Sequence, residues 1–137
     1  MIKVLYIDDE ADTEKMASKF EIMREEGIDV IPVARISDVL PTLNSNKDSV
    51  NVIVLDLIMP PEDVYTSQET EAGTLTGLRL LEDIRRYTKE TPVIVVSIRR
   101  RPSAEGVLSR YGISEYLEKP ISASDLVQSI KEHLTQY

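Results

Sequence analysis

The sequence predicts an α/β fold in which five short parallel strands form one sheet and helices cover both of its faces. Three observations favour this fold class. Five apolar runs rich in β-branched residues alternate along the chain with segments of helical periodicity. Two of these runs are almost continuously apolar, which is typical of strands buried on both faces. The 137 residues are the length of one ordinary domain, so we expect a single doubly wound (βα)5 sandwich over residues 1–137.

The strands are expected where the apolar runs are short and rich in β-branched residues. These runs are Ile2–Ile7, Ile28–Val33, Val50–Leu55, Pro92–Val96 and Ile113–Leu117.

The first two helices are predicted from apolar spacing and from residues that start or stop a helix. Met16, Phe20 and Met23 share one face of a helix over about residues 12–26, and Gly27 ends it. Ser37 is a suitable N-cap for a short second helix that runs through Leu43.

A third helix through Tyr87 is predicted by the spacing of Leu78, Leu81 and Ile84. The segment before it, about residues 60–76, has no apolar periodicity and is too long for an ordinary strand-to-helix loop. This segment carries four acidic residues and no Lys or Arg. Long loops of this kind are usually functional or mobile.

The last two helices are expected over residues 103–111 and from Ser122 through His133. The first of them ends at Gly112, a residue suited to a helix C-terminus. Ser122, followed three positions later by Asp125, resembles a capping box with Asp in place of the usual Glu.

Composition excludes several classes of function. There is no cysteine, which excludes disulfide scaffolds, Cys-ligated zinc, iron–sulfur clusters and thiol catalysis. The net charge of −8 opposes direct binding to nucleic acid. The apolar runs are too short to span a membrane, and the N-terminus lacks a signal-peptide layout. We therefore expect a soluble, cytoplasmic domain.

Polar residues follow four of the expected strands. Asp8 and Asp9 follow the first, Asp56 the third, Ser97 the fourth and Lys119 the fifth. Ligands of open α/β sheets bind at the carboxyl ends of the strands, so these side chains are expected at one edge of the sheet.

The chemistry of these groups indicates phosphoryl transfer. Neighbouring strands lie about 4.8 Å apart, so carboxylates at the ends of adjacent strands repel each other. A hard divalent cation such as Mg²⁺ or Mn²⁺ relieves that repulsion. Lys119 adds a positive charge and Ser97 a hydrogen-bond donor, which together suit a transferred phosphoryl group. A carboxylate in this setting can act as the nucleophile and form an acyl phosphate.

At these residues the chain resembles the receiver domain of two-component response regulators, from Lys3 to about Leu134. The resemblance implies the flavodoxin-like strand order 2-1-3-4-5. Four motifs in order carry it: Ile7-Asp8-Asp9-Glu10, Leu55-Asp56-Leu57-Ile58-Met59-Pro60, Val95-Val96-Ser97 and Tyr116-Leu117-Glu118-Lys119-Pro120.

The resemblance implies a role for each residue near the phosphorylation site. Asp56 accepts a phosphoryl group from a phosphohistidine of a sensor histidine kinase or phosphotransfer protein. Asp9 and Asp56 bind Mg²⁺ directly, together with the backbone carbonyl of Ile58, and Asp8 acts mainly through water. Lys119 pairs with a phosphate oxygen.

The resemblance also implies a conformational switch. Ser97 moves to hydrogen-bond the phosphoryl group, and Tyr116 then swings inward. The surface built from the last two helices and the strand between them changes and selects a downstream output protein or domain. A homodimer through the same surface is expected, and the Lys119–Pro120 peptide bond is expected to be cis.

Two departures from the family pattern stand out. Ile98 occupies a position after the switch hydroxyl where the family usually has a small residue, so we expect restricted access to Asp56 and slow labelling by small donors. Gly77, which opens the third helix, arrives about a dozen residues late.

A basic run, Arg99, Arg100 and Arg101, follows the fourth strand at the same edge. We expect it to contact the acidic segment or a partner, forming a lid beside the site.

Three other functions compete with the phosphorylated switch. The main alternative is a receiver-like interaction module that no longer uses phosphate. A nucleotide or flavin binder would need a glycine-rich or hydroxyl cradle, whereas the turn at residues 8–12 is acidic. A Mg²⁺-dependent phosphohydrolase would need a cap or second domain to hold its substrate. We therefore expect a signalling domain rather than an enzyme, with at most self-catalysed phosphorylation and dephosphorylation of Asp56.

Overall fold

The structure is a computed structural model, and it describes residues 1–59, 76–98 and 112–134. The strands are β1 (Ile2–Ile7), β2 (Ile28–Val33), β3 (Val52–Leu55), β4 (Val93–Ser97) and β5 (Glu115–Glu118). The helices in the described ranges are α1 (Glu14–Glu25), α2 (Ile36–Asn46), α4 (Thr76–Tyr87) and α6 (Ala123–Leu134). The predicted helix over 103–111 lies outside the described residues. No helix in the described ranges is long and apolar enough to cross a membrane.

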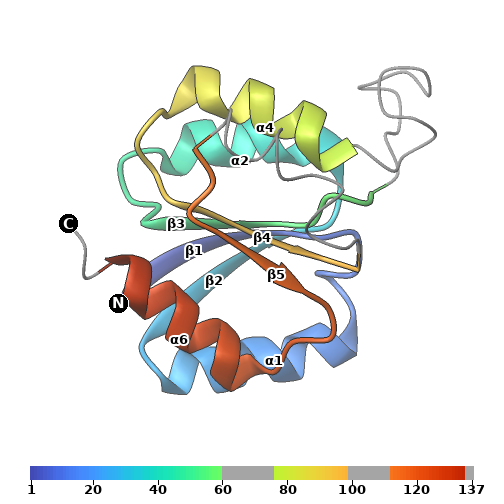
Figure 1. Cartoon of the computed structure of the whole chain (residues 1–137), viewed down its shortest axis with the longest axis vertical. Coiled ribbons are helices and arrows are strands. Elements are labelled where there is room, and N and C mark those ends of the chain that lie inside the picture. Colours follow the sequence, from blue (N-terminus) through green and yellow to red (C-terminus); the bar gives the residue numbers. More distant parts are fainter. Residues whose placement is uncertain (60–75, 99–111, 135–137) are drawn as a thin grey trace.

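The strands form one parallel sheet in the order β2-β1-β3-β4-β5, which confirms the predicted fold class. Helices α2 and α4 cover one face of the sheet, and α1 and α6 cover the other (Figure 1). Alternate residues of each central strand enter different cores: Leu5 and Ile53 pack on the α2 and α4 side, Val4 and Val52 on the opposite side. This burial on both faces explains why the strands are almost continuously apolar.

The predicted helix starts are partly confirmed. Thr13 caps α1, since its hydroxyl accepts a hydrogen bond from the Met16 N–H. Ser122 caps α6 in the same way and accepts from the Asp125 N–H at 3.1 Å.

The prediction for α2 was wrong at both ends. The helix begins at Ile36, and Arg35 is the N-cap residue, so Ser37 lies inside the first turn. Ile36 is buried, and packing its side chain into the core outweighs the local preference of Ser37 for a cap position. The helix continues past Leu43 to Asn46, whose side-chain amide donates to the Thr42 carbonyl at 2.8 Å.

Strand register sets the positions of the polar residues that follow the strands. Ile7 of β1 pairs with Leu55 of β3, and the Asp56 N–H donates to the Ile7 carbonyl at 2.9 Å. The residues after these two strands, Asp8 and Asp56, therefore lie side by side. On the far side of β4, the Lys119 N–H donates to the Ser97 carbonyl at 2.8 Å.

Gly77 lets α4 begin directly against the segment that carries Asp56. Its N–H donates to the Leu57 carbonyl at 2.8 Å. A Cβ atom on Gly77 would lie 2.3 Å from the Asp56 carbonyl oxygen and 2.5 Å from the Leu57 Cα, distances that real Cβ atoms do not adopt. Both obstacles are backbone atoms, so the helix or the site must move to make room.

The Gly77→Ala variant is expected to lose about 2–3 kcal/mol of unfolding free energy because of this overpacking. Helix propensity by itself predicts the opposite sign, a gain of about 0.5–1 kcal/mol. Urea denaturation measures the difference. Gly27→Ala is the control, because Gly27 has φ +88° but open space around it and should show only the strain of a left-handed residue, about 1–2 kcal/mol. A stabilised Gly77→Ala protein would contradict the close packing.

Candidate functional site

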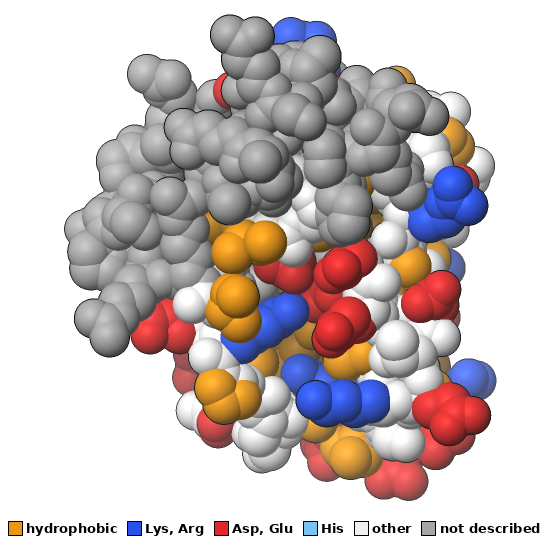
Figure 2. Space-filling view, turned by 90° about the vertical axis from the view of Figure 1, so that its right-hand side faces the viewer, with side chains coloured by type: hydrophobic (Ala, Val, Ile, Leu, Met, Phe, Trp, Pro, Cys, Tyr) orange, Lys and Arg blue, Asp and Glu red, His pale blue; other side chains and the backbone are white. Residues whose placement is uncertain are grey.

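Three carboxylates meet at the carboxyl edge of the sheet. Asp8 is 3% exposed and Asp56 is 6% exposed, whereas Asp9 is exposed to solvent. One oxygen from each of the three lies within 4.8 Å of those from the other two. Figure 2 shows acidic side chains gathered on this face, with basic and hydrophobic side chains beside them. Buried carboxylates at this spacing require compensating positive charge.

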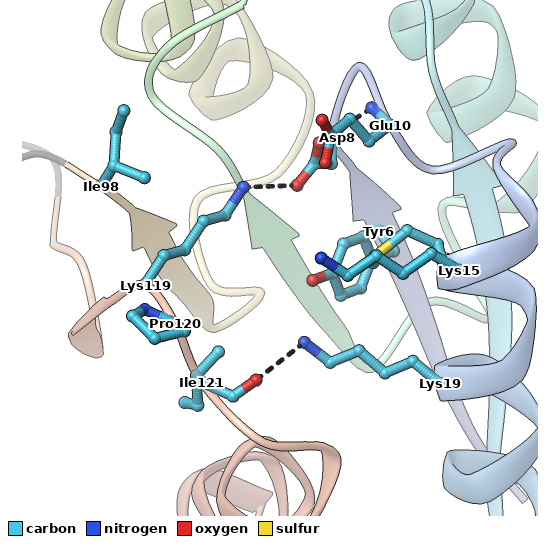
Figure 3. Close-up of a pocket in the computed structure, with 10 residues that line it drawn as sticks. Tyr6, Asp8, Glu10, Lys15, Lys19, Ile98, Lys119, Pro120 and Ile121 are labelled. Carbon is cyan, nitrogen blue, oxygen red and sulfur yellow. Dashed lines mark hydrogen bonds and ion pairs between the residues drawn. The ribbon is translucent and has the colours of Figure 1, made fainter.

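Lys119 supplies one positive charge and joins the two buried carboxylates. Its Nζ lies 2.9 Å from Asp8 Oδ2 and 3.2 Å from Asp56 Oδ2 (the contact with Asp8 is drawn in Figure 3). The remaining oxygens accept from backbone N–H groups: Glu10 donates to Asp8 Oδ1 at 2.9 Å, and Ile58 donates to Asp56 Oδ1 at 3.0 Å. Both carboxylates are thereby held in fixed orientations.

Burial and the neighbouring charges together decide how these groups titrate. Burial raises the pKa of Asp56 to about 6, and the charge of Asp8 adds to the rise, while Lys119 and the Ile58 N–H oppose it. Burial and the neighbouring Asp8 also raise the pKa of Asp9. Burial opposes the charge on Lys119, but attraction and hydrogen bonds from Asp8 and Asp56 outweigh it, so the pKa of Lys119 is raised.

The donor set fits a hard divalent cation. Asp8, Asp9 and Asp56 offer carboxylate oxygens, the ligands that Mg²⁺ and Mn²⁺ prefer. Within the described ranges the one ammonium group of Lys119 bonds two of the three carboxyl groups, and burial keeps the pKa of Asp56 raised despite this contact. A divalent cation would supply the missing positive charge.

The two expected switch residues lie on the strands next to this cluster. Ser97 is fully buried at the carboxyl end of β4, the strand between those that lead to Asp56 and Lys119. Tyr116 is 7% exposed, and its side chain packs in the core on the α2 and α4 face of the sheet. The Lys119–Pro120 peptide bond is cis, as expected.

The groups expected to restrict access are only partly described. Ile98 is 70% exposed and stands beside Lys119 at the rim of the site (Figure 3). The run Arg99, Arg100 and Arg101 and the acidic segment 60–75 lie outside the described residues, so the predicted lid stays a prediction.

A hollow that was not predicted from the sequence lies next to the carboxylate cluster. Tyr6, Lys15 and Lys19 line it together with Lys119. The signal that could have found it is the spacing of Lys15 and Lys19, four positions apart on one face of a helix.

A model of the response regulator receiver domain matches residues 4–131, which is almost the whole chain. The chain belongs to this family. Receiver domains are signalling domains of two-component systems, and in this one Asp8, Asp56 and Lys119 form a single bonded group with Asp9 beside it.

Individual relatives agree with the assignment. The transcriptional regulatory protein CpxR of Klebsiella pneumoniae is 27% identical over 131 residues, which cover 96% of this chain and 48% of that protein. The chain thus spans about half the length of CpxR. Protein PilG of Pseudomonas aeruginosa is 27% identical over 141 residues, covering 99% of this chain and 90% of PilG. The solved receiver domain of a Francisella response regulator matches with a TM-score of 0.75 at 27% identity, covering 99% of this chain and 98% of the other.

The Asp56→Asn variant is expected to be more stable than the natural receiver domain in metal-free buffer at neutral pH. The folded pKa of Asp56, about 6, lies above its unfolded value of 3.8, so ionisation of Asp56 opposes folding. The gain should be about 1–3 kcal/mol at about pH 7.5, and it should shrink as the pH falls from 6 towards 4, where folded Asp56 takes up a proton.

Urea denaturation in EDTA at the two ends of this pH range measures the effect. Asp48→Asn is the control, because Asp48 is exposed and its removal should change little. An equal gain at both pH values, or a loss at neutral pH, would contradict the raised pKa of Asp56.

Proposed function

We propose that this receiver domain is a phosphorylated switch in which Asp56 accepts a phosphoryl group from a phosphohistidine of a sensor histidine kinase or phosphotransfer protein. The observation that carries the proposal is the shared ammonium group of Lys119, which lies within 3.2 Å of both buried carboxylates. A buried carboxylate beside a fixed cation and two further acids is suited to be a metal-assisted nucleophile.

The proposed step is a displacement at phosphorus. An Asp56 carboxylate oxygen forms the new P–O bond, the P–N bond to the donor imidazole breaks, and the electron pair leaves with the imidazole. The product on this chain is an acyl phosphate. The Lys119 Nζ already donates a hydrogen bond to the attacking Asp56 carboxylate, so after the transfer it can donate to a phosphoryl oxygen instead.

The proposed metal ligands are Asp9, Asp56 and the Ile58 backbone carbonyl, with Asp8 acting mainly through water. The structure supports this division, because Asp8 is buried and bonded to Lys119 whereas Asp9 faces solvent. Bound Mg²⁺, or Mn²⁺ in its place, would neutralise the charge that develops on the transferred group. Self-catalysed loss of the phosphoryl group would need the same residues and a water molecule.

Output is proposed to pass through Ser97 and Tyr116. Ser97 ends the strand next to Asp56, and its backbone carbonyl accepts a hydrogen bond from the Lys119 backbone N–H, so a shift of one backbone would displace the other. Tyr116 lies on β5 and pairs with Val95 of β4. The proposed output surface comprises the helix expected over 103–111, β5 and α6. It would bind a downstream protein or domain, or a second copy of the chain.

We also propose that residues 1–137 form one receiver domain, since the family match covers most of the chain. Its site of action is proposed to be the cytoplasm, where a kinase can be charged from ATP.

Incubation with acetyl phosphate and Mg²⁺, followed by intact-mass spectrometry, tests the proposed function. One added phosphoryl group is expected on the natural chain and none on Asp56→Asn. EDTA should prevent the addition, because the carboxylate charge is then uncompensated. The Ile98→Ala variant is expected to label faster, since the exposed Ile98 side chain stands at the rim beside Lys119.

Labelling that persists in Asp56→Asn, or that is unaffected by EDTA, would contradict a metal-dependent acceptor at Asp56. An unchanged rate in Ile98→Ala would remove the steric role of Ile98 and leave the acceptor role intact.

A further inference from the structure

A hollow of about 440 Å³ lies beside the carboxylate cluster, between α1 and the segment that follows β5. Figure 3 shows Lys15 and Lys19 extending from α1 towards the segment at Pro120 and Ile121, with the Tyr6 hydroxyl between the two sides. Asp8 and Lys119 line the hollow as well, and Lys119 also contacts Asp56, so the hollow adjoins the carboxylate cluster. Its volume falls in the range of small-molecule binding sites.

The positive charges in the hollow are poorly compensated. Lys19 is half-buried, and its Nζ donates to the Ile121 carbonyl at 3.2 Å, a neutral partner. Burial and the charge of Lys119 lower the pKa of Lys19, although the negative charge of Asp8 partly opposes this shift. Among the described residues neither Lys15 nor Lys19 forms an ion pair. Lys15 is exposed and Lys19 half-buried, so the hollow offers an anionic ligand two ammonium groups that no described carboxylate holds.

The acidic residues on the wall do not supply the missing partner. Asp8 is already bonded to Lys119 through one oxygen and to the Glu10 N–H through the other. Glu10, which also lines the hollow, is exposed to solvent. Neither acid therefore forms an ion pair with Lys15 or Lys19, which leaves both ammonium groups available to an anion that enters the hollow.

The remaining walls are apolar. The side chains of Ile98, Pro120 and Ile121 present apolar surface to the hollow, whereas Tyr6 and Met16, which also line it, are buried. The Tyr6 ring is fixed by an edge-on contact with Phe20 at a centroid distance of 5.0 Å. Simple inorganic anions would leave these surfaces uncovered, whereas an anion attached to a ring or short chain would cover them.

We propose that this hollow binds a small organic anion, with a phosphate or carboxylate group held by Lys15 and Lys19 and an apolar body packed against Pro120 and Ile121. Asp56 itself does not line the hollow, although Asp8 and Lys119 belong to both sites, and binding of the anion requires neither Mg²⁺ nor phosphorylation of Asp56. Lys119 borders both sites, so a bound anion lies next to the ammonium group that Asp56 uses.

Titration of the natural chain with phenyl phosphate in EDTA, followed by amide chemical shifts, tests the proposal. Saturable shifts are expected at Lys19 and Ile121. Benzoate should bind the same site, since it carries the other candidate head group, and its affinity relative to phenyl phosphate identifies which group the site prefers. Inorganic phosphate lacks the apolar body and phenol lacks the charge, so each should bind at least tenfold more weakly.

Single substitutions locate the binding site. Lys15→Gln and Lys19→Gln should each weaken phenyl phosphate binding at least fivefold, and glutamine at position 19 keeps a donor for the Ile121 carbonyl. Lys131→Gln is the matched control, because Lys131 lies on α6 outside the hollow and pairs with Glu26. Thermal unfolding of each variant checks that it is folded.

The proposal is overturned if phenyl phosphate gives no saturable shifts, if phenol binds as well, or if neither lysine substitution weakens binding. Metal-free binding and metal-dependent labelling of Asp56 are separate measurements, so failure of one leaves the other standing.

Discussion

The ammonium group of Lys119, shared between Asp8 and Asp56, is the interaction on which the rest of the site depends. Burying two carboxylates side by side is costly unless positive charge and hydrogen bonds accompany them. Lys119 reaches both from β5, across the end of β4, and backbone N–H groups hold the other two oxygens. The hydrogen bond from the Lys119 backbone N–H to the Ser97 carbonyl fixes the position from which the Lys119 side chain extends.

In the described part of the chain, the single positive charge of Lys119 balances only one of the two buried carboxylates. The proposed chemistry uses the negative charge that remains. The pKa of Asp56 stays raised despite the contact with Lys119, so the metal-free site holds its negative charge at a cost. Under the proposed function, a divalent cation and a phosphoryl group would together change this balance at the point where β3, β4 and β5 end. Under the proposed function, a change in charge at Asp56 would act on Lys119 through their contact, and the Lys119 backbone N–H is hydrogen-bonded to the Ser97 carbonyl.

Much of this arrangement could be predicted from the sequence, because strands buried on both faces leave a clear apolar signal and parallel strands end at one edge. That rule places Asp8, Asp56 and Lys119 together before any contact is known. Side-chain contacts could not be predicted: which carboxylates Lys119 joins depends on the exact register. The start of α2 was misplaced because burial of Ile36 outweighs a local cap preference. The hollow at Lys15 and Lys19 depends on how α1 packs, which periodicity does not reveal.

Beryllofluoride binding followed by ¹⁹F NMR tests the central claim most directly, because this acyl-phosphate mimic needs no donor and therefore does not depend on access for a leaving group. The account predicts one bound signal that requires both Mg²⁺ and the Asp56 carboxylate and that weakens when Lys119 is replaced by methionine. A bound signal retained in Asp56→Asn, or no bound signal at saturating Mg²⁺, would contradict the account.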